Sequence, residues 1–237
     1  MNSFDIGIIT FLNQFAHHSQ VFDSLVVLVV QNDLFKGGVF MALLWWVWVE
    51  PKNNLNKNDG REYVLPTLFA SIFAVFLARA LALSLSFQTR PLQTPEIHFQ
   101  IPYMVDISNL EGWSSFPSDH AALFITLAIG LILASRRIGM ISLFYAIFII
   151  LLPRLYIGLH WPTDILAGAL IGLAIGLLSN ISKVRDFIND LCWRWLDKHP
   201  SSFYACFFLL TYQTAVLFDD ARNILSIFGK LILSSSF

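Results

Sequence analysis

Long apolar stretches, separated by short polar segments, make up most of the chain after its first 33 residues. A membrane-spanning helix needs ~20 mostly apolar residues, with a working range of about 17 to 25. We predict five spans, over residues 34–49, 63–87, 118–135, 139–158 and 162–181, and a weaker sixth over 203–218. The pattern therefore predicts an all-α fold, a polytopic membrane helical bundle with five or six transmembrane helices.

The two ends of the chain follow a different pattern. Apolar residues recur at helical spacing over 4–15, which predicts an N-terminal interfacial helix, and the short apolar run 21–30 predicts a re-entrant or interfacial segment. A charged segment follows the fifth span, and an amphipathic tail covers 224–233. We therefore divide the chain into an N-terminal segment (1–33), a membrane domain (34–182) and a C-terminal segment (183–237).

Composition supports the membrane assignment and excludes other classes. Of the 237 residues, 56% are hydrophobic and 13% are charged, against roughly 25% charged in soluble domains. Fifteen Lys and Arg against sixteen Asp and Glu give no basic surface for nucleic acid. Aromatic residues at 15% exclude a disordered chain. The expected partner of the apolar surface is therefore the membrane bilayer.

The distribution of Lys and Arg predicts the orientation of the bundle. Nine lie in loops on one side of the predicted spans: Lys52, Lys57, Arg61, Arg136, Arg137, Lys183, Arg185, Arg194 and Lys198. Four lie on the other side: Lys36, Arg90, Arg222 and Lys230. Because the richer side is cytoplasmic in most membrane proteins, we expect a multi-pass protein of the cell (inner) membrane. The loop 88–117 and the turn around His160 then face the outer, periplasmic side.

Every candidate for chemistry falls on that outward side, at the end of a span. Arg90-Pro91 follows the second span, and Pro117-Ser118-Asp119-His120 opens the third. Arg154, His160 and Asp164 lie across the turn between the fourth and fifth spans, with the spacing Arg-x5-His-x3-Asp. Ionisable residues at such positions are costly in lipid, so they indicate a functional site. Taken singly, Arg154 also fits a snorkelling side chain, and His160 with Asp164 fits a helix-start pair.

Together these residue types suit phosphoryl transfer. The planar fork of arginine matches phosphate oxygens, and Ser118 lies at a predicted helix N-terminus, which favours an anion. A neutral imidazole can attack phosphorus while a carboxylate holds its other nitrogen, and the spacing of His160 and Asp164 allows that pairing. The second imidazole, His120, can then protonate the leaving group.

This constellation resembles the type 2 phosphatidic acid phosphatase (PAP2) superfamily of membrane lipid phosphatases. The family's motifs are Lys-x6-Arg-Pro, Pro-Ser-Gly-His and Ser-Arg-x5-His-x3-Asp, and the resemblance covers residues 34–181. It implies a phosphohistidine on His160, with Asp164 orienting the ring and His120 as acid and then base. It also implies that Arg90, Arg154 and Ser118 bind the phosphate. No metal or cofactor is expected, because positive charge is already supplied and no carboxylate cluster exists to bind a metal.

Three departures from the motifs bear on the substrate. Leu83 stands where the first motif has lysine, and Arg79, one helical turn earlier, is the candidate replacement for that phosphate contact. Asp119 replaces the glycine of the second motif and is assigned to substrate binding; this variant resembles bacterial undecaprenyl-diphosphate phosphatases. Pro153 replaces the serine of the third motif.

The expected activity is therefore hydrolysis of a lipid phosphomonoester or diphosphate at the outer leaflet, with undecaprenyl diphosphate as the leading substrate. Two alternatives remain open at this stage. One is a phosphotransferase of the same family that acts on lipid or lipopolysaccharide. The other is a non-catalytic transporter or scaffold that uses the same cationic pocket for a phosphate lipid. The sequence leaves the oligomeric state open.

Overall fold

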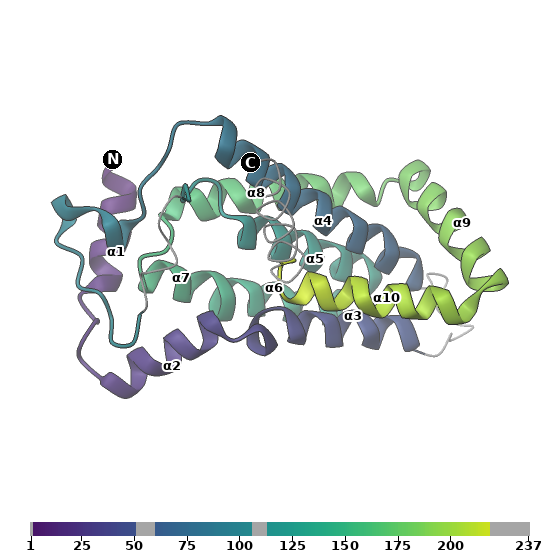
Figure 1. Ribbon diagram of the computed structural model, residues 1–237, viewed down its shortest axis with the longest axis horizontal. Helices are drawn as coiled ribbons and strands as arrows, with labels where there is room; N and C mark the ends of the chain where they lie inside the picture. The colour runs from purple at the N-terminus through teal and green to yellow at the C-terminus, as the bar shows by residue number, and fades with distance from the viewer. Residues whose placement is uncertain (1, 51–59, 106–112, 219–237) are drawn as a thin grey trace, which may run out of the picture.

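The computed structural model describes residues 2–50, 60–105 and 113–218, and within them every regular element is a helix (Figure 1). The first half contains α1 (Ser3–Asn13), α2 (Gln20–Gln31), α3 (Val39–Val49) and α4 (Arg61–Ser84). The second half contains α5 (Asp119–Ala134), α6 (Arg136–Tyr145), α7 (Leu152–Tyr156), α8 (Pro162–Ser179), α9 (Ser182–Lys198) and α10 (Pro200–Ala215). The all-helical fold that the sequence predicts is confirmed. The predicted tail at 224–233 lies outside the described residues.

Helix α5 forms the centre of the bundle, between α4, α6 and α8 (Figure 1). All eight residues from Ala121 to Ala128 are buried, and Leu123, Phe124 and Leu127 are completely so. A helix that is apolar on every side is expected to be surrounded by protein in this way. Since α5 begins at Asp119, the first turn of the most buried helix carries Asp119 and His120 at the end of the bundle.

The α5–α8 contact is close because small residues face α5. An added Cβ at Gly168 would lie 2.2 Å from the carbonyl oxygen of Ser118, and one at Gly172 would lie 2.5 Å from that of Ala122. Small residues at such a spacing let helix backbones approach closely in membranes. The first turns of α5 and α8 are thereby held side by side.

Helix length supports fewer spans than the sequence predicts. Among the described helices, three are long and apolar enough to cross a membrane: Arg61–Ser84, Arg136–Tyr156 and Pro162–Ser179. A fourth results if α2 and the helix from Leu34 to Val49 count as one span, although they are bent by 68°. The predicted five or six spans are therefore not confirmed. Helix α5 has 16 residues, or about 24 Å, and falls short of the ~30 Å hydrocarbon core.

The N-terminal segment folds over one end of the bundle. Helix α1 crosses that end, and α2 leads from it along the side toward α3 (Figure 1). Between α2 and α3 the chain forms a π-helical turn, η1 (Leu34–Gly38). The predicted helix over 4–15 is thus present, but nothing in the fold confirms that it lies in the membrane interface.

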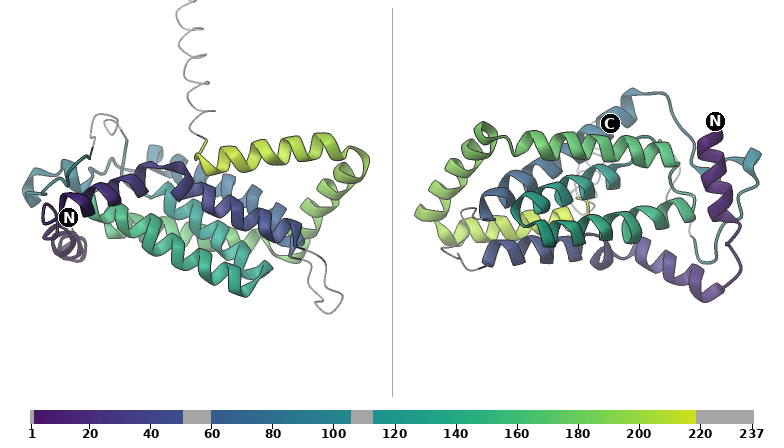
Figure 2. Two further views of the ribbon diagram at one scale, coloured as in Figure 1. Left: turned by 90° about the horizontal axis from the view of Figure 1, so that it is seen from below. Right: turned by 180° about the vertical axis from the view of Figure 1, so that it is seen from behind.

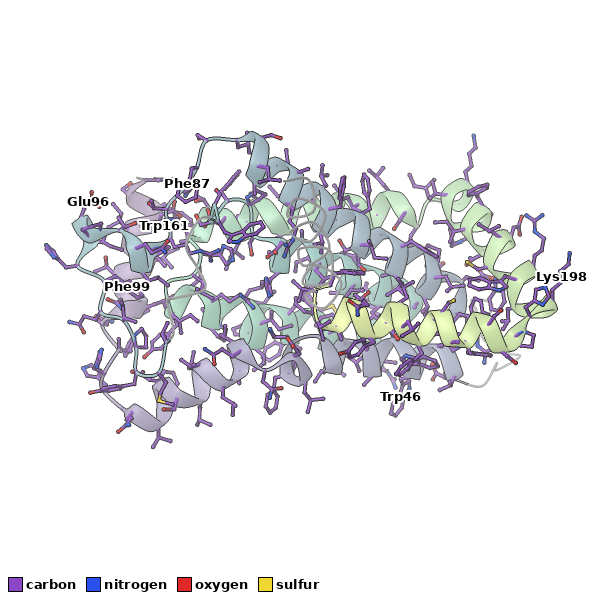
Figure 3. All side chains as sticks on the ribbon, viewed as in Figure 1. Trp46, Phe87, Glu96, Phe99, Trp161 and Lys198 are labelled. Carbon is purple, nitrogen blue, oxygen red and sulfur yellow. The ribbon has the colours of Figure 1, made fainter. Side chains whose placement is uncertain are left out.

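Helices α9 and α10 close the opposite end. After α8 the chain turns sharply into α9, and α10 returns beside α3 (Figures 1 and 2). Aromatic rings join them, since Trp48 of α3 stacks on Trp193 of α9 and lies against Phe207 of α10. Figure 3 shows Lys198 at this end and Trp161, Phe99 and Glu96 at the other.

Candidate active site

The loop after α4 is fastened to the turn between α7 and α8. Arg90 Nη1 donates a hydrogen bond to the carbonyl oxygen of Leu159 (2.9 Å), and the Leu92 amide donates to Gly158 (3.1 Å). Gly158 has a φ of +74°, and an added Cβ there would lie 2.7 Å from the Phe99 ring, so the turn requires glycine. The first and third motifs are therefore held together by main-chain contacts.

The second motif is joined to the third through backbone and cap. The Ser118 amide donates to the carbonyl oxygen of Asp164 (3.1 Å), and Ser118 Oγ accepts from the Ala121 amide (3.4 Å) as the N-cap of α5. Ser118 is completely buried. Its hydroxyl oxygen therefore caps the helix, and Ser118 is not among the residues that line the cavity described below. The direct phosphate contact that the sequence predicts for Ser118 stays a prediction.

His160 is held by a main-chain carbonyl. Its Nδ1 lies 2.9 Å from the carbonyl oxygen of Ser115, and since a carbonyl only accepts, Nδ1 carries the proton. The nearest Asp164 oxygen is 3.7 Å from Nδ1, which is too long for the hydrogen bond that the sequence predicts. Asp164 Oδ2 instead accepts from the Trp161 amide (2.8 Å) at the start of α8. Nε2 of His160 is consequently the nitrogen with a free lone pair.

Asp119 links His120 to Arg79. One carboxylate oxygen lies 2.7 Å from His120 Nδ1 and the other 2.7 Å from Arg79 Nη2. Asp119 thus holds the ring by Nδ1 and leaves its Nε2 free. The sequence assigns Asp119 and Arg79 to the substrate, whereas the structure pairs them with each other. Leu83, at the position of the motif lysine, is 79% exposed and points away from the site.

The arginines keep unused donors. Arg154 is 5% exposed, and its guanidinium makes no hydrogen bond or ion pair with any described residue. The buried Nε atoms of Arg79 and Arg90 also lack a partner among the described residues. Buried donors without partners are costly, so they indicate a site for an anion. Burial lowers the pKa of Arg90, and the nearby Asp119 and Asp164 carboxylates partly oppose that change. Arg90 stays protonated, because the ordinary pKa of arginine is far above neutral pH.

These side chains surround one cavity of about 230 Å³. Six residues that the sequence predicts for the site are in its wall: Arg79, Arg90, Asp119, His120, Arg154 and His160. Ser118 and Asp164, both fully buried, lie behind that wall. Trp113 adds a ring 6.0 Å from the Arg79 guanidinium. The cavity thus combines cationic donors with two imidazole rings.

Two features of the site escaped the sequence analysis. The acceptor for His160 is the backbone of Ser115, which no side-chain motif can reveal. Asp5 of α1 accepts from the Thr163 amide (2.9 Å) and hydroxyl (2.7 Å), so it caps α8 from 158 residues away. The sequence offered one signal for this contact, because Asp5 is a single carboxylate in an otherwise apolar segment. Among the described residues, no group of three or more His, Cys, Asp or Glu is placed to hold a metal ion.

Comparisons with known proteins find a matching family model and similar sequences. A sequence model of the PAP2 superfamily matches residues 63–187. Undecaprenyl-diphosphatase BcrC of Bacillus subtilis is 23% identical over 69% of this chain and 76% of its own length. Bacitracin transport permease protein BcrC of Bacillus licheniformis is 26% identical over 73% and 77%.

A solved structure shares the fold. The crystal structure of LpxE from Aquifex aeolicus superposes with a TM-score of 0.50 and 25% identity, over 73% of this chain and 92% of that chain. The putative undecaprenyl-diphosphatase YbjG of Escherichia coli is similar over a shorter stretch, at 40% identity over 27% of this chain and 32% of its own.

Proposed function

Since the chain belongs to the PAP2 superfamily, we propose that this membrane lipid phosphatase hydrolyses a lipid diphosphate of the undecaprenyl diphosphate class through a phosphohistidine intermediate. One observation carries the proposal: the buried Arg154 guanidinium, which has no partner among the residues that the structure describes, shares a cavity with His120 and His160, both held by Nδ1. A buried cation with unused donors is preorganised for an anion, and phosphoryl transfer depends mainly on such positioning.

In the first step, His160 is the nucleophile. The lone pair on Nε2 forms a bond to the terminal phosphorus, while Nδ1–H stays on the Ser115 carbonyl. The bond from phosphorus to the bridging oxygen breaks, and its electron pair goes to that oxygen. Asp164, 3.7 Å from Nδ1, stabilises the positive imidazole by charge.

His120 handles the protons. The acid is the doubly protonated ring, whose Nδ1–H is held by Asp119 and whose Nε2–H protonates the bridging oxygen as the lipid monophosphate leaves. In the second step, His120 takes a proton from water, the water oxygen bonds to phosphorus, and the nitrogen–phosphorus bond breaks. Inorganic phosphate and free His160 result. In this scheme Asp119 and Arg79 position the acid, while Arg90 and Arg154 hold the phosphate oxygens.

The substrate class rests on relatives and on one residue. The printed names of relatives from Bacillus subtilis and Escherichia coli include undecaprenyl-diphosphatase, at 23% and 40% identity. Asp119 gives this chain the motif variant that resembles such enzymes. We extend that substrate to this chain as a proposal.

We also propose the placement in the cell membrane. The site lies at the end of the bundle opposite Lys198, and the nine-to-four distribution of Lys and Arg supports an outward-facing site. Helices α3, α5 and α10 are proposed to cross together with the longer helices, since they run alongside them (Figure 1). Helix α1 is then placed in the outer interface.

The test is phosphate release by the purified protein from lipid diphosphates and lipid monophosphates. We expect inorganic phosphate from wild type and none from His160→Ala, with an acid-labile, base-stable label trapped on wild type. The His120→Ala variant should still attack substrates with an acidic phenol leaving group almost normally, because such a leaving group needs no proton. Label on His160→Ala but not on His120→Ala would mean that the two histidines have exchanged roles.

The same assay separates the alternatives. A phosphotransferase would pass the label to a second lipid and release little inorganic phosphate. A transporter or scaffold would keep its function in His160→Ala, because binding requires no nucleophile. Either result would contradict the proposal.

A further inference from the structure

Lys36 is a buried cation outside the matched family region. It lies in the π-helical turn η1, before residues 63–187, and is 8% exposed. Its Nζ is 2.7 Å from an oxygen of Asp33, whose side chain is 45% exposed. A lysine buried in an apolar bundle is costly and indicates a function. π-Helical turns occur often at functional sites.

Helix packing places Lys36 at the depth of His120. The inner ends of α3 and α5 meet, because an added Cβ on Gly60 would lie 2.9 Å from Val47 and 3.5 Å from the Ala134 carbonyl oxygen. The two helices therefore run in the same direction. Farther out, the rings of Phe40 and Phe124 are 5.0 Å apart.

Lys36 precedes Phe40 by four residues, and His120 precedes Phe124 by four. Lys36 and His120 thus lie about one turn outward from the ring contact, at the same level of the two helices. Lys36 is close enough to His120, Arg154 and Asp119 for electrostatic interaction with each of them. This agrees with the depth that the helix packing gives.

The first motif leaves a phosphate contact unfilled. Leu83 replaces the motif lysine and points outward, 79% exposed. Arg79, the candidate replacement, is paired with Asp119. Lys36, from a different segment, is a further cation at the level of the proposed acid, and the leaving group would depart on the side of that acid.

We infer that Lys36 binds the leaving phosphate of a diphosphate substrate, exchanging Asp33 for it, and so makes the enzyme prefer lipid diphosphates to lipid monophosphates. This inference rests on the proposed function. When the substrate is a lipid diphosphate, the leaving group is a charged lipid monophosphate, whose oxygens an ammonium group can hold. When the substrate is a lipid monophosphate, the leaving group is an alcohol, whose oxygen His120 protonates and which offers Lys36 no charge. Lys36 is therefore a specificity-determining residue.

The test compares Lys36→Met with Lys36→Arg on a lipid diphosphate and on the monophosphate of the same lipid. Lys36→Met should lower kcat/KM for the diphosphate by about 10- to 100-fold, the usual worth of a charged hydrogen bond. The monophosphate should change by less than about 3-fold, and Lys36→Arg should keep most of the preference. If Lys36→Met does not purify, Lys36→Gln removes the same charge. Equal losses on both substrates would overturn the inference.

Asp33→Asn is the matched control. It breaks the Lys36–Asp33 pair but keeps the ammonium group. If Lys36 only stabilises the fold through that pair, Asp33→Asn and Lys36→Met will lose activity alike, and the inference fails. If Lys36 binds phosphate, Asp33→Asn should keep or increase activity on the diphosphate.

A binding measurement separates this inference from the proposed hydrolysis. Inorganic diphosphate and inorganic phosphate are titrated into detergent-purified wild type and Lys36→Met by calorimetry. We expect diphosphate to bind at least about 10-fold more weakly to the variant, with phosphate unchanged. If wild type releases no phosphate from any lipid but this difference is present, the proposed hydrolysis fails, while the binding of a diphosphate by Lys36 stands. Equal diphosphate binding by both proteins overturns it.

Discussion

The α5–α8 contact predicts a graded response to added methyl groups. In Gly168→Ala the new Cβ would lie 2.2 Å from the Ser118 carbonyl oxygen and 2.9 Å from Ala121 Cβ. A relaxed contact needs ~3.5 Å, so the two backbones must separate by ~1 Å, since a backbone carbonyl cannot rotate away inside a helix. At the same level the Ser118 amide bonds to Asp164. A misplacement of ~1 Å can cost ~100-fold in rate, and we expect that loss in kcat.

Gly176→Ala is the matched control on the same helix. There the new Cβ would lie 3.0 Å from Ile129 Cβ and 3.3 Å from the Thr126 carbonyl oxygen, so a shift of a few tenths of an ångström relieves the contact, which lies about two turns farther from the site. Both variants should lose some stability, because overpacking costs ~1–3 kcal/mol. Phosphate release at equal folded protein and the melting temperature in detergent are measured for each. Gly176→Ala should keep kcat within about 3-fold, well below the ~100-fold for positional damage.

Two results would refute this reasoning. If Gly168→Ala keeps wild-type kcat, then the close approach of the helices does not position the site. If both variants lose kcat in proportion to their melting temperatures, the loss reflects general destabilisation and not the placement of Ser118 and Asp164.

Three further predictions concern the acid, the cap of α8 and metal ions. Asp119→Asn should lower kcat/KM by about 10- to 100-fold, since a charged hydrogen bond to His120 is lost, and the alkaline limb of the pH–rate profile should move to lower pH; an unmoved limb would contradict the positioning role. Asp5→Asn should lower the free energy of unfolding by ~0.5–2 kcal/mol, because in wild type the two oxygens of Asp5 accept both Thr163 hydrogen bonds at the start of α8. The melting temperature measures this loss, and an unchanged melting temperature would contradict the capping role. Activity should survive chelator and be inhibited by vanadate; loss with chelator and rescue by magnesium would contradict the mechanism.

The sequence predicts the fold class and the members of the site well, for a physical reason. Span ends are visible because lipid excludes charge, so Arg90, His120 and Arg154 mark where apolar runs stop. The predicted alternation of spans across the bilayer puts these residues at one end of the bundle, and the structure has them in the wall of one cavity. Span number was less predictable, because a central helix such as α5 is covered by protein and need not match the lipid thickness.

The partner of His160 was not predictable from spacing. An i,i+4 pairing assumes a continuous helix, but α8 begins at Pro162 and His160 lies in the turn before it. Its ring therefore faces another loop, where the Ser115 carbonyl accepts from Nδ1. Every residue has a backbone carbonyl, so the sequence cannot indicate that the carbonyl of Ser115, 45 residues away, is the acceptor.

Amphipathic spacing also could not say what the N-terminal segment covers. An apolar helix face fits a lipid interface and a protein surface equally well, and the polar residues decide between them. Asp23 accepts from the Tyr156 hydroxyl and from the amides of Tyr103 and His17. Its carboxylate is completely buried, so protein replaces water around it.

The N-terminal segment is part of the machinery that holds the site. Asn13 exchanges hydrogen bonds with the backbone of Gln100 in the outer loop, in both directions. Asp23 fastens α2 to α7, which carries Arg154, and Asp5 caps α8, whose first turn carries Asp164. The proposed catalytic groups come from the family motifs, yet buried carboxylates outside residues 63–187 hold the helices that carry them. A segment that the hydrophobic pattern assigns to the lipid surface therefore also holds two of the helices that carry the candidate site.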